Sequence, residues 1–175
     1  MAVSAAISHP GAAVRWVVMG VSGCGKSAVG SRLAAQLHIE YIEGDALHPP
    51  DNVAKMAAGQ PLGDEDRAGW LAALRERIAV ARQNGLGLVV SCSALKRRYR
   101  DLLREGDPTL RFAHLHGPRT VLESRVRDRP GHFMPASLLD SQLATLQPLQ
   151  ADEAGMVLDI RQPLATLVQQ IAQAA

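Results

Sequence analysis

The chain has 175 residues, of which 47% are hydrophobic and 21% are charged, and its formal net charge is +2. This length is that of one domain with a sizeable core, and the composition excludes a disordered or fibrous protein. The small positive charge does not indicate a nucleic-acid partner, and no apolar run reaches the roughly 18 residues that a membrane span needs. We therefore expect a cytoplasmic protein without a nucleic-acid or membrane partner.

The two ends of the chain and its two cysteines place few constraints on function. Residues 1–13 are rich in small side chains and lack a basic stretch before an apolar one, so they predict a flexible leader rather than a secretory signal. Residues 14–175 are expected to form one domain. Cys24 and Cys92 lie far apart without a CxxC pattern, which favours neither a metal site nor a disulfide framework and fits a reducing compartment.

Short apolar runs alternate with helical patterns along the whole chain. The expected strands are residues 14–19, 41–45, 86–93, 111–116 and 156–160. The expected helices are residues 28–37, 53–59, 64–84, 94–105, 119–129 and 164–173, with a loop and a helix between 132 and 146. Such alternation with right-handed crossovers predicts an α/β fold of three layers, in which helices cover both faces of a five-stranded parallel sheet.

The first expected strand runs into the sequence GVSGCGKS, residues 20–27, which fits the phosphate-loop pattern GxxxxGK[ST]. Glycines let the backbone amides of such a loop turn toward a phosphate. Lys26 is expected to reach the β- and γ-phosphate oxygens, and the hydroxyl of Ser27 to face Mg²⁺ at the start of the following helix. The strand before the loop and the helix after it favour a nucleoside triphosphate site over an empty turn.

The type of phosphate-loop protein is indicated by what the rest of the chain contains. Neither asparagine belongs to the NKxD pattern that reads guanine, which disfavours a GTPase, and the chain is short for a motor ATPase. A kinase of a small molecule needs an orienting carboxylate or base, an anion clamp and arginines near the transferring group. Asp45 follows the second strand, where ligands of open α/β sheets bind, and could accept a hydroxyl proton or contact Mg²⁺.

Several basic residues are candidates for the anion clamp and for a lid. Arg67 and Lys96 follow predicted turns or strand ends and could hold an anionic substrate, although a solvated surface position is the alternative for each. Arg125 and Arg129 lie four apart on one helix face, before a proposed lid at about residues 128–138. They could close over ATP phosphates, or could instead pair with neighbouring acidic side chains.

Histidines and Cys24 have both structural and functional interpretations. His48 and His132 lie in loops beside the proposed site and could contact substrate or phosphate. His114 and His116 share one strand face but have no third metal ligand at a telling spacing, so packing is the better interpretation. A redox role is conceivable for Cys24 inside the loop, but a small residue that fits the loop is favoured.

Taken together, five segments resemble a known family. They are GVSGCGKSAVG, EGDALHPPDNVAKMAAGQPLGDEDRAGWL, SCSALKRRYRDLLR, RPGHFMPASLLDSQLATLQ and DIRQPL. The chain is similar over about residues 14–164 to the bacterial gluconokinases of the P-loop, thermoresistant type, which are relatives of shikimate kinases and nucleoside monophosphate kinases. The resemblance implies the P-loop kinase fold with a lid region.

The resemblance also implies a reaction: ATP and D-gluconate give ADP and 6-phospho-D-gluconate, with Mg²⁺ and usually in a homodimer. It implies that Lys26, Asp45 and Arg125 are catalytic. The nucleotide site implied by the resemblance consists of Gly23, Cys24, Gly25, Lys26, Ser27, Ala28, Arg125, Arg129, Gln162 and Pro163. The acceptor site implied by the resemblance and the loop positions consists of Asp45, His48, Arg67, Lys96, Arg100 and His132.

No aspartate ends the strand expected at 86–93, where many P-loop proteins hold Mg²⁺ through water. Ser27 is therefore the one protein ligand expected for the metal, with Asp45 and water beside it. Two alternatives stay open: a kinase of another small hydroxylated anion, such as shikimate, and an ATP-binding regulatory protein that transfers no phosphate.

Overall fold

A parallel sheet forms the centre of the computed structural model, which describes residues 13–128 and 137–175. The described residues contain five strands, in the order β2-β3-β1-β4-β5, and all four neighbouring pairs are parallel. The strands are β1 (Arg15–Met19), β2 (Glu40–Glu43), β3 (Leu88–Ser91), β4 (Arg111–His116) and β5 (Gly155–Asp159). The five-stranded α/β sheet expected from the sequence is confirmed.

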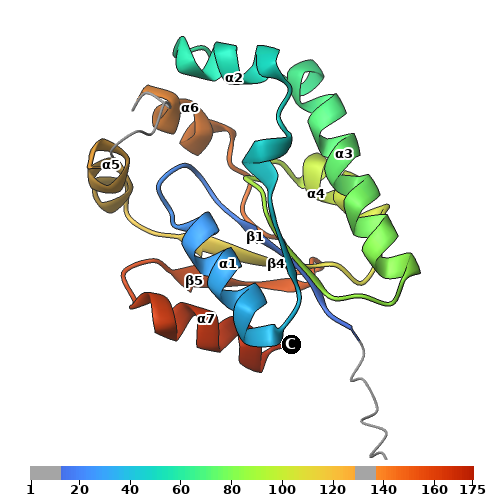
Figure 1. The fold of residues 1–175 in the computed structure, drawn as a ribbon. Helices are drawn as coiled ribbons and strands as arrows, with labels where there is room; N and C mark the ends of the chain where they lie inside the picture. Colours follow the sequence, from blue (N-terminus) through green and yellow to red (C-terminus); the bar gives the residue numbers. More distant parts are fainter. Residues whose placement is uncertain (1–12, 129–136) are drawn as a thin grey trace, which may run out of the picture.

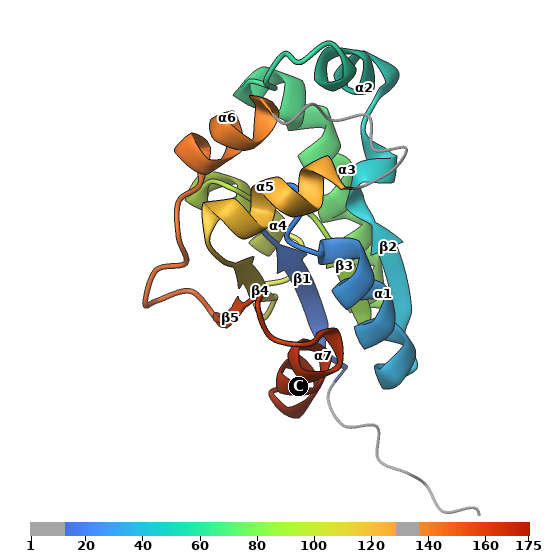
Figure 2. The same cartoon turned by 90° about the vertical axis from the view of Figure 1, so that its left-hand side faces the viewer.

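Helices cover both faces of this sheet, so the fold has three layers (Figure 1). The α-helices are α1 (Lys26–Leu37), α2 (Pro50–Ala57), α3 (Asp64–Gln83), α4 (Arg97–Arg104), α5 (Arg119–Arg127), α6 (Ser137–Thr145) and α7 (Leu164–Gln173). A short 3₁₀ helix, η1 (Gly44–Leu47), follows β2. The phosphate loop leaves the sheet at the carboxyl end of β1. Both views place α2 and α6 beyond this end of the strands (Figure 1 and Figure 2).

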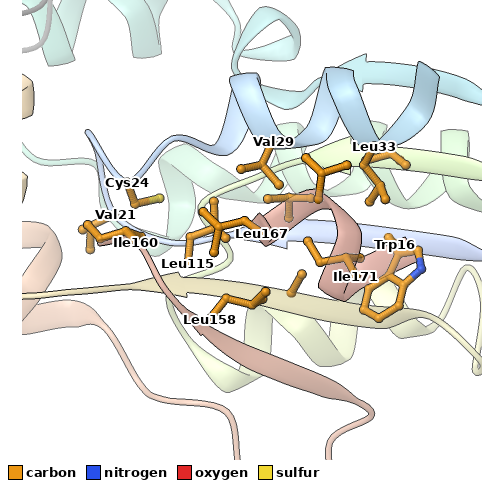
Figure 3. Close-up of a cluster of buried hydrophobic side chains, with 14 of the residues drawn as sticks. Trp16, Val21, Cys24, Val29, Leu33, Leu115, Leu158, Ile160, Leu167 and Ile171 are labelled. Carbon is orange, nitrogen blue, oxygen red and sulfur yellow. The ribbon is translucent and has the colours of Figure 1, made fainter. Parts of the chain in front are cut away.

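Two buried clusters hold the layers together, one on each face of the sheet. Trp16 of β1 points toward α1 and α7, where it lies near Leu33 and Ile171 (Figure 3), and Val18 belongs to the same buried cluster. The alternate residues of β1 point to the other face and pack against α3 and α4. Because successive strand residues face opposite sides, a strand buried on both faces is almost entirely apolar, as β1 is.

Two element boundaries differ from those expected and matter for the site. The second strand ends at Glu43, so Asp45 lies in η1 rather than on the strand. The fourth helix begins at Arg97 and not at residue 94, because Ala94 has a φ of 44° and lies in the left-handed region, which a helix cannot include. Lys96 therefore precedes the helix in extended conformation.

Some expectations fall on parts of the chain that are not described. The leader expected at residues 1–13 and the lid expected at 128–138 lie wholly or mostly outside the described residues, as do Arg129 and His132. In the described ranges, no helix combines the length and the apolar character needed to cross a membrane.

Candidate active site

The phosphate loop connects β1 to α1 and is shaped by glycine. Gly25 has a φ of 98°, a left-handed backbone conformation that residues other than glycine rarely adopt. No atom lies within 4 Å of the position that a Cβ would occupy there. At Gly23 a Cβ would lie 2.8 Å from Cγ2 of Val126 in α5. The loop is thus open at Gly25, where a ligand could approach its backbone, and closely packed at Gly23.

Lys26 and Ser27 begin α1 at the mouth of this loop. The ammonium of Lys26 donates to the carbonyl oxygen of Val21 at 3.1 Å, so it lies across the loop. The hydroxyl of Ser27 donates to the carboxylate of Glu43. Both residues line a pocket, and both are where the loop pattern places the partners of a triphosphate and its metal.

Glu43 is a site residue that the sequence analysis missed. Its carboxylate accepts hydrogen bonds from Ser27, from the Tyr41 hydroxyl at 2.7 Å and from the Ser91 hydroxyl at 2.8 Å. Burial raises the pKa of this carboxyl, but the hydroxyl donors outweigh burial and the net pKa is lowered. An ionised carboxylate beside a hydroxyl is a suitable pair of oxygen ligands for Mg²⁺. The available signal was its position at the end of β2, next to the phosphate loop.

The pocket beside the loop brings together residues from distant segments. It is closed by η1, α2, the start of α3, the end of β3 and α6, and α6 also contacts the loop directly, since Gln142 accepts a hydrogen bond from the Ser22 amide at 2.7 Å. The expected site residues that line this pocket are Gly23, Gly25, Lys26, Ser27, Asp45, His48 and Arg67. Asp45, the carboxylate expected to face the acceptor hydroxyl, therefore lies in the same pocket as the phosphate loop.

Arg67 supplies a nearly buried positive charge to this pocket. Its exposed fraction is 9%, and its recorded hydrogen bond is from Nη1 to the neutral hydroxyl of Tyr99, at 3.1 Å. No carboxylate among residues 13–128 and 137–175 forms an ion pair with it. A buried cation is costly unless an anion compensates it, so this guanidinium is suited to an anionic ligand.

His48 lies on the indole of Trp70, with ring centroids 4.0 Å apart and planes 18° apart. Burial lowers the pKa of His48, Arg67 lowers it further, and Asp45 acts in the opposite direction. The imidazole is therefore neutral at neutral pH. A neutral ring in this pocket can hydrogen-bond an oxygen of a ligand.

Lys96 lies near the pocket without lining it. Its ammonium is 3.0 Å from Oδ1 of Asp64 and 5.7 Å from the ring centre of Tyr99. The same Asp64 carboxylate accepts hydrogen bonds from Tyr99 and Arg98. Lys96 is thus paired with Asp64, whose carboxylate also binds the Tyr99 hydroxyl that contacts Arg67.

The structure does not support the expected contact of Arg100 with the acceptor. Arg100 is fully buried, and its guanidinium donates to both carboxylate oxygens of Glu153, at 2.7 and 3.0 Å. It also donates to the carbonyl oxygens of Ala94 and Pro148. Every face of the group is occupied by the protein, so Arg100 stabilises the fold and has no donor left for a ligand.

Arg125 lies on α5, and its side chain reaches the connection between β5 and α7. Its Nη2 donates to the carbonyl oxygen of Ile160 at 2.8 Å, and its charge acts on Cys24 in the phosphate loop. Gln162 and Pro163 lie two and three positions after Ile160, so the Arg125 contact is close to both along the chain. The alternative partner Glu123 instead accepts from Arg119, at 2.7 Å. Ala28 is exposed in the first turn of α1.

Cys24 and His114 agree with the structural interpretations. The Cys24 side chain points into the buried cluster among Val21, Leu115 and Ile160 (Figure 3), and burial raises the pKa of its thiol. His114 is buried with neither ring nitrogen hydrogen-bonded, and burial lowers its pKa to about 4. In the described part of the chain, no three or more His, Cys, Asp or Glu residues form a group that could hold a metal ion.

Comparisons with known proteins show the family to which the chain belongs. A family model described as an AAA domain matches residues 16–149. The thermoresistant gluconokinase of Escherichia coli (strain K12) is 52% identical over 155 residues, which is 87% of this chain and 88% of that protein. A gluconokinase structure from Sinorhizobium meliloti 1021 has a TM-score of 0.83 at 50% identity, covering 93% of this chain and 91% of that one. A sugar kinase structure from Janibacter sp. HTCC2649 has a TM-score of 0.88 at 49% identity, covering 92% and 93% of the two chains. The chain therefore belongs to the AAA-domain family that the model describes and, within it, to the gluconokinases.

Proposed function

We propose that this protein transfers the γ-phosphoryl group of ATP to D-gluconate and releases ADP and 6-phospho-D-gluconate. The observation that carries the proposal is the nearly buried Arg67, which lacks an acidic partner in the described structure and shares a pocket with Lys26, Ser27 and Asp45. Such a pocket suits an acceptor that is itself an anion. The relatives named gluconokinases support gluconate as that anion.

The nucleotide side of the site uses the loop and its two ends. The open backbone at Gly25 and the ammonium of Lys26 bind the phosphates, and Arg125 adds positive charge. Gln162 and Pro163 line the adenine. Ser27 and Glu43 would hold Mg²⁺, which would neutralise phosphate charge.

The acceptor side positions one hydroxyl and one carboxylate. Arg67 binds the carboxylate of gluconate. Asp45 accepts a hydrogen bond from the reacting hydroxyl and orients this hydroxyl toward the γ-phosphate. His48 contacts the part of gluconate that lies between these two groups. Because the carboxylate and the reacting hydroxyl are at opposite ends of gluconate, binding at Arg67 helps to place the far end for reaction. Arg129 and His132, outside the described residues, stay predictions for the lid.

The test is ATP- and Mg²⁺-dependent formation of 6-phosphogluconate, coupled to its dehydrogenase, with shikimate and AMP as parallel acceptors. Product from gluconate alone supports the proposal. ADP release with shikimate or AMP but not with gluconate overturns the acceptor assignment. ATP binding without product from any acceptor indicates a regulatory protein. Light scattering on the same sample tests the expected homodimer.

A further inference from the structure

A hydrogen-bonded chain links α3 to the imidazole of His48 through Asn52. The side-chain nitrogen of Asn52 lies 2.7 Å from the backbone carbonyl oxygen of Asp66 and 3.2 Å from Nδ1 of His48. Asn52 is 4% exposed, so water does not compete freely for these bonds. The buried amide is therefore held by partners on two different elements.

The carbonyl of Asp66 fixes which end of the Asn52 amide faces it. A backbone carbonyl can only accept, so the amide must present its NH₂ group; the flipped amide would place two acceptor oxygens in contact. The second hydrogen of the same NH₂ group is then directed at Nδ1 of His48. An NH₂ group cannot accept, so Nδ1 must carry a lone pair, and the proton of the neutral ring is on Nε2.

The plane of the ring is fixed independently. Stacking on Trp70 sets its tilt, and the indole NH of Trp70 is itself anchored to the carbonyl oxygen of Gly44 at 2.8 Å. The bond to Asn52 prevents rotation of the ring within that plane. Among the residues that the structure describes, Nε2 has no recorded hydrogen-bond partner, although His48 lines the pocket with Asp45 and Arg67.

We propose that Asn52 is a positioning residue which holds His48 as the Nε2–H tautomer, so that His48 donates a hydrogen bond to a hydroxyl oxygen of the bound acceptor and does not act as a base. This assignment rests on the proposed function for its ligand, but the tautomer itself does not. It leaves Asp45 as the group that accepts from the reacting hydroxyl. It also gives the HPPDN segment a role in acceptor recognition.

The tautomer is tested without substrate, by NMR of protein labelled with ¹⁵N-histidine. We expect one His48 nitrogen, Nε2, to be protonated at neutral pH, and Nδ1 to show the downfield shift of a nitrogen with a lone pair. The spectrum of His48→Gln identifies the signals by their loss. A protonated Nδ1, as the other tautomer or as imidazolium, would overturn the proposal whether or not gluconate is the acceptor.

The donor role is tested by two substitutions that place an amide NH₂ at different positions. His48→Gln can place it near Nε2, and we expect the gluconate KM to stay within about threefold of the wild type. His48→Asn can place it only near Nδ1, and we expect the KM to rise about tenfold, the effect of one hydrogen bond of about 1.4 kcal/mol. The ATP KM should not change in either variant.

His116→Gln, at an exposed histidine outside the pocket, is the matched control and should behave as the wild type. An equal gluconate KM for His48→Gln and His48→Asn would overturn the donor role. So would a loss of kcat of more than about a hundredfold in both variants, because that result indicates a base. If the wild-type protein does not phosphorylate gluconate, the proposed function fails, and the NMR result still decides the tautomer.

Discussion

Arg67 and Arg100 are both buried arginines on the α3–α4 side of the sheet, but their guanidinium groups have different surroundings. Arg100 is paired with Glu153 through two hydrogen bonds and is capped by backbone carbonyls. Arg67 has one recorded hydrogen bond, to a neutral tyrosine hydroxyl, and lines a pocket. The comparison separates a charge that the fold neutralises from a charge that needs a ligand.

The difference between the two arginines comes from partners that are remote in the chain. Glu153 lies 53 positions from Arg100, on the segment that leads into β5. Local sequence does not predict this difference, because Arg67 directly follows the acidic residues 64–66 and yet forms no ion pair within the described structure, whereas Arg100 lies in the basic segment KRRYR and is paired. A buried guanidinium is therefore informative about binding only after its carboxylate partners are known.

Among the residues that line the pocket with Arg67, Asp45 is expected to have the largest effect on catalysis. Asp45→Asn should lower kcat about 10²- to 10⁴-fold, because the amide is a poor acceptor for the hydroxyl proton. Steady-state kinetics with gluconate measure this, and calorimetry should give nearly unchanged ATP affinity. A kcat close to the wild-type value would remove the orienting or base role.

For the buried ion pair, Arg100→Met should lower the free energy of unfolding by about 3 kcal/mol. This value is at the low end for breaking a buried ion pair, because Arg104 still pairs with Glu153. Urea unfolding followed by circular dichroism measures the change. The double variant Arg100→Met/Glu153→Leu should recover part of the lost stability, since the buried carboxylate is removed together with its partner. A single variant as stable as the wild type would contradict the structural role.

Arg67→Met should have the converse pattern. The gluconate KM should rise roughly 10- to 100-fold, as expected from losing hydrogen bonds to a charged group worth about 1.5–3 kcal/mol. The free energy of unfolding should stay the same or rise, because an uncompensated buried charge is removed. Arg77→Met, at an exposed position of the same helix, is the control for both measurements. An unchanged gluconate KM would exclude Arg67 from the anion site.

The ion pair of Arg100 also predicts a pH dependence. Burial raises the pKa of Glu153, but hydrogen bonds from Arg100 and Arg104 outweigh it and lower the pKa from 4.5 to about 2. A lowered folded-state pKa contributes stability above pH 4.5, and this contribution is lost as the pH falls toward 2. Urea unfolding between these pH values should therefore show a smaller loss of stability in the Arg100→Met/Glu153→Leu variant than in the wild type. Equal losses would show that Glu153 is not the titrating group.

The smallest effect is expected at Tyr99, which connects the pocket to the acidic partner of Lys96. Tyr99→Phe removes the acceptor of Arg67, and we expect the gluconate KM to rise about two- to tenfold. The ATP KM should not change. A gluconate KM equal to that of the wild type would show that Arg67 is oriented without the hydroxyl.

The two halves of the candidate site differ in how far the sequence predicts them. Gly23, Gly25, Lys26 and Ser27 are contiguous, so their mutual geometry is set by one strand–loop–helix connection and can be inferred from the pattern. Glu43 was missed because the second strand was expected to end at Asp45, whereas it ends at Glu43, and the order β2-β3-β1 brings this end close to the loop.

The alternation of strands and helices, the phosphate loop and the resemblance to a kinase family can all be inferred from the sequence. These are encoded in local periodicity and in contiguous motifs. Three features become visible only in the folded chain: the pocket beside Arg67, the neutralisation of Arg100 and the contact of the Asn52 amide with His48. Charge compensation and hydrogen-bond direction depend on groups tens of residues away, which come together only when the helices pack on the sheet.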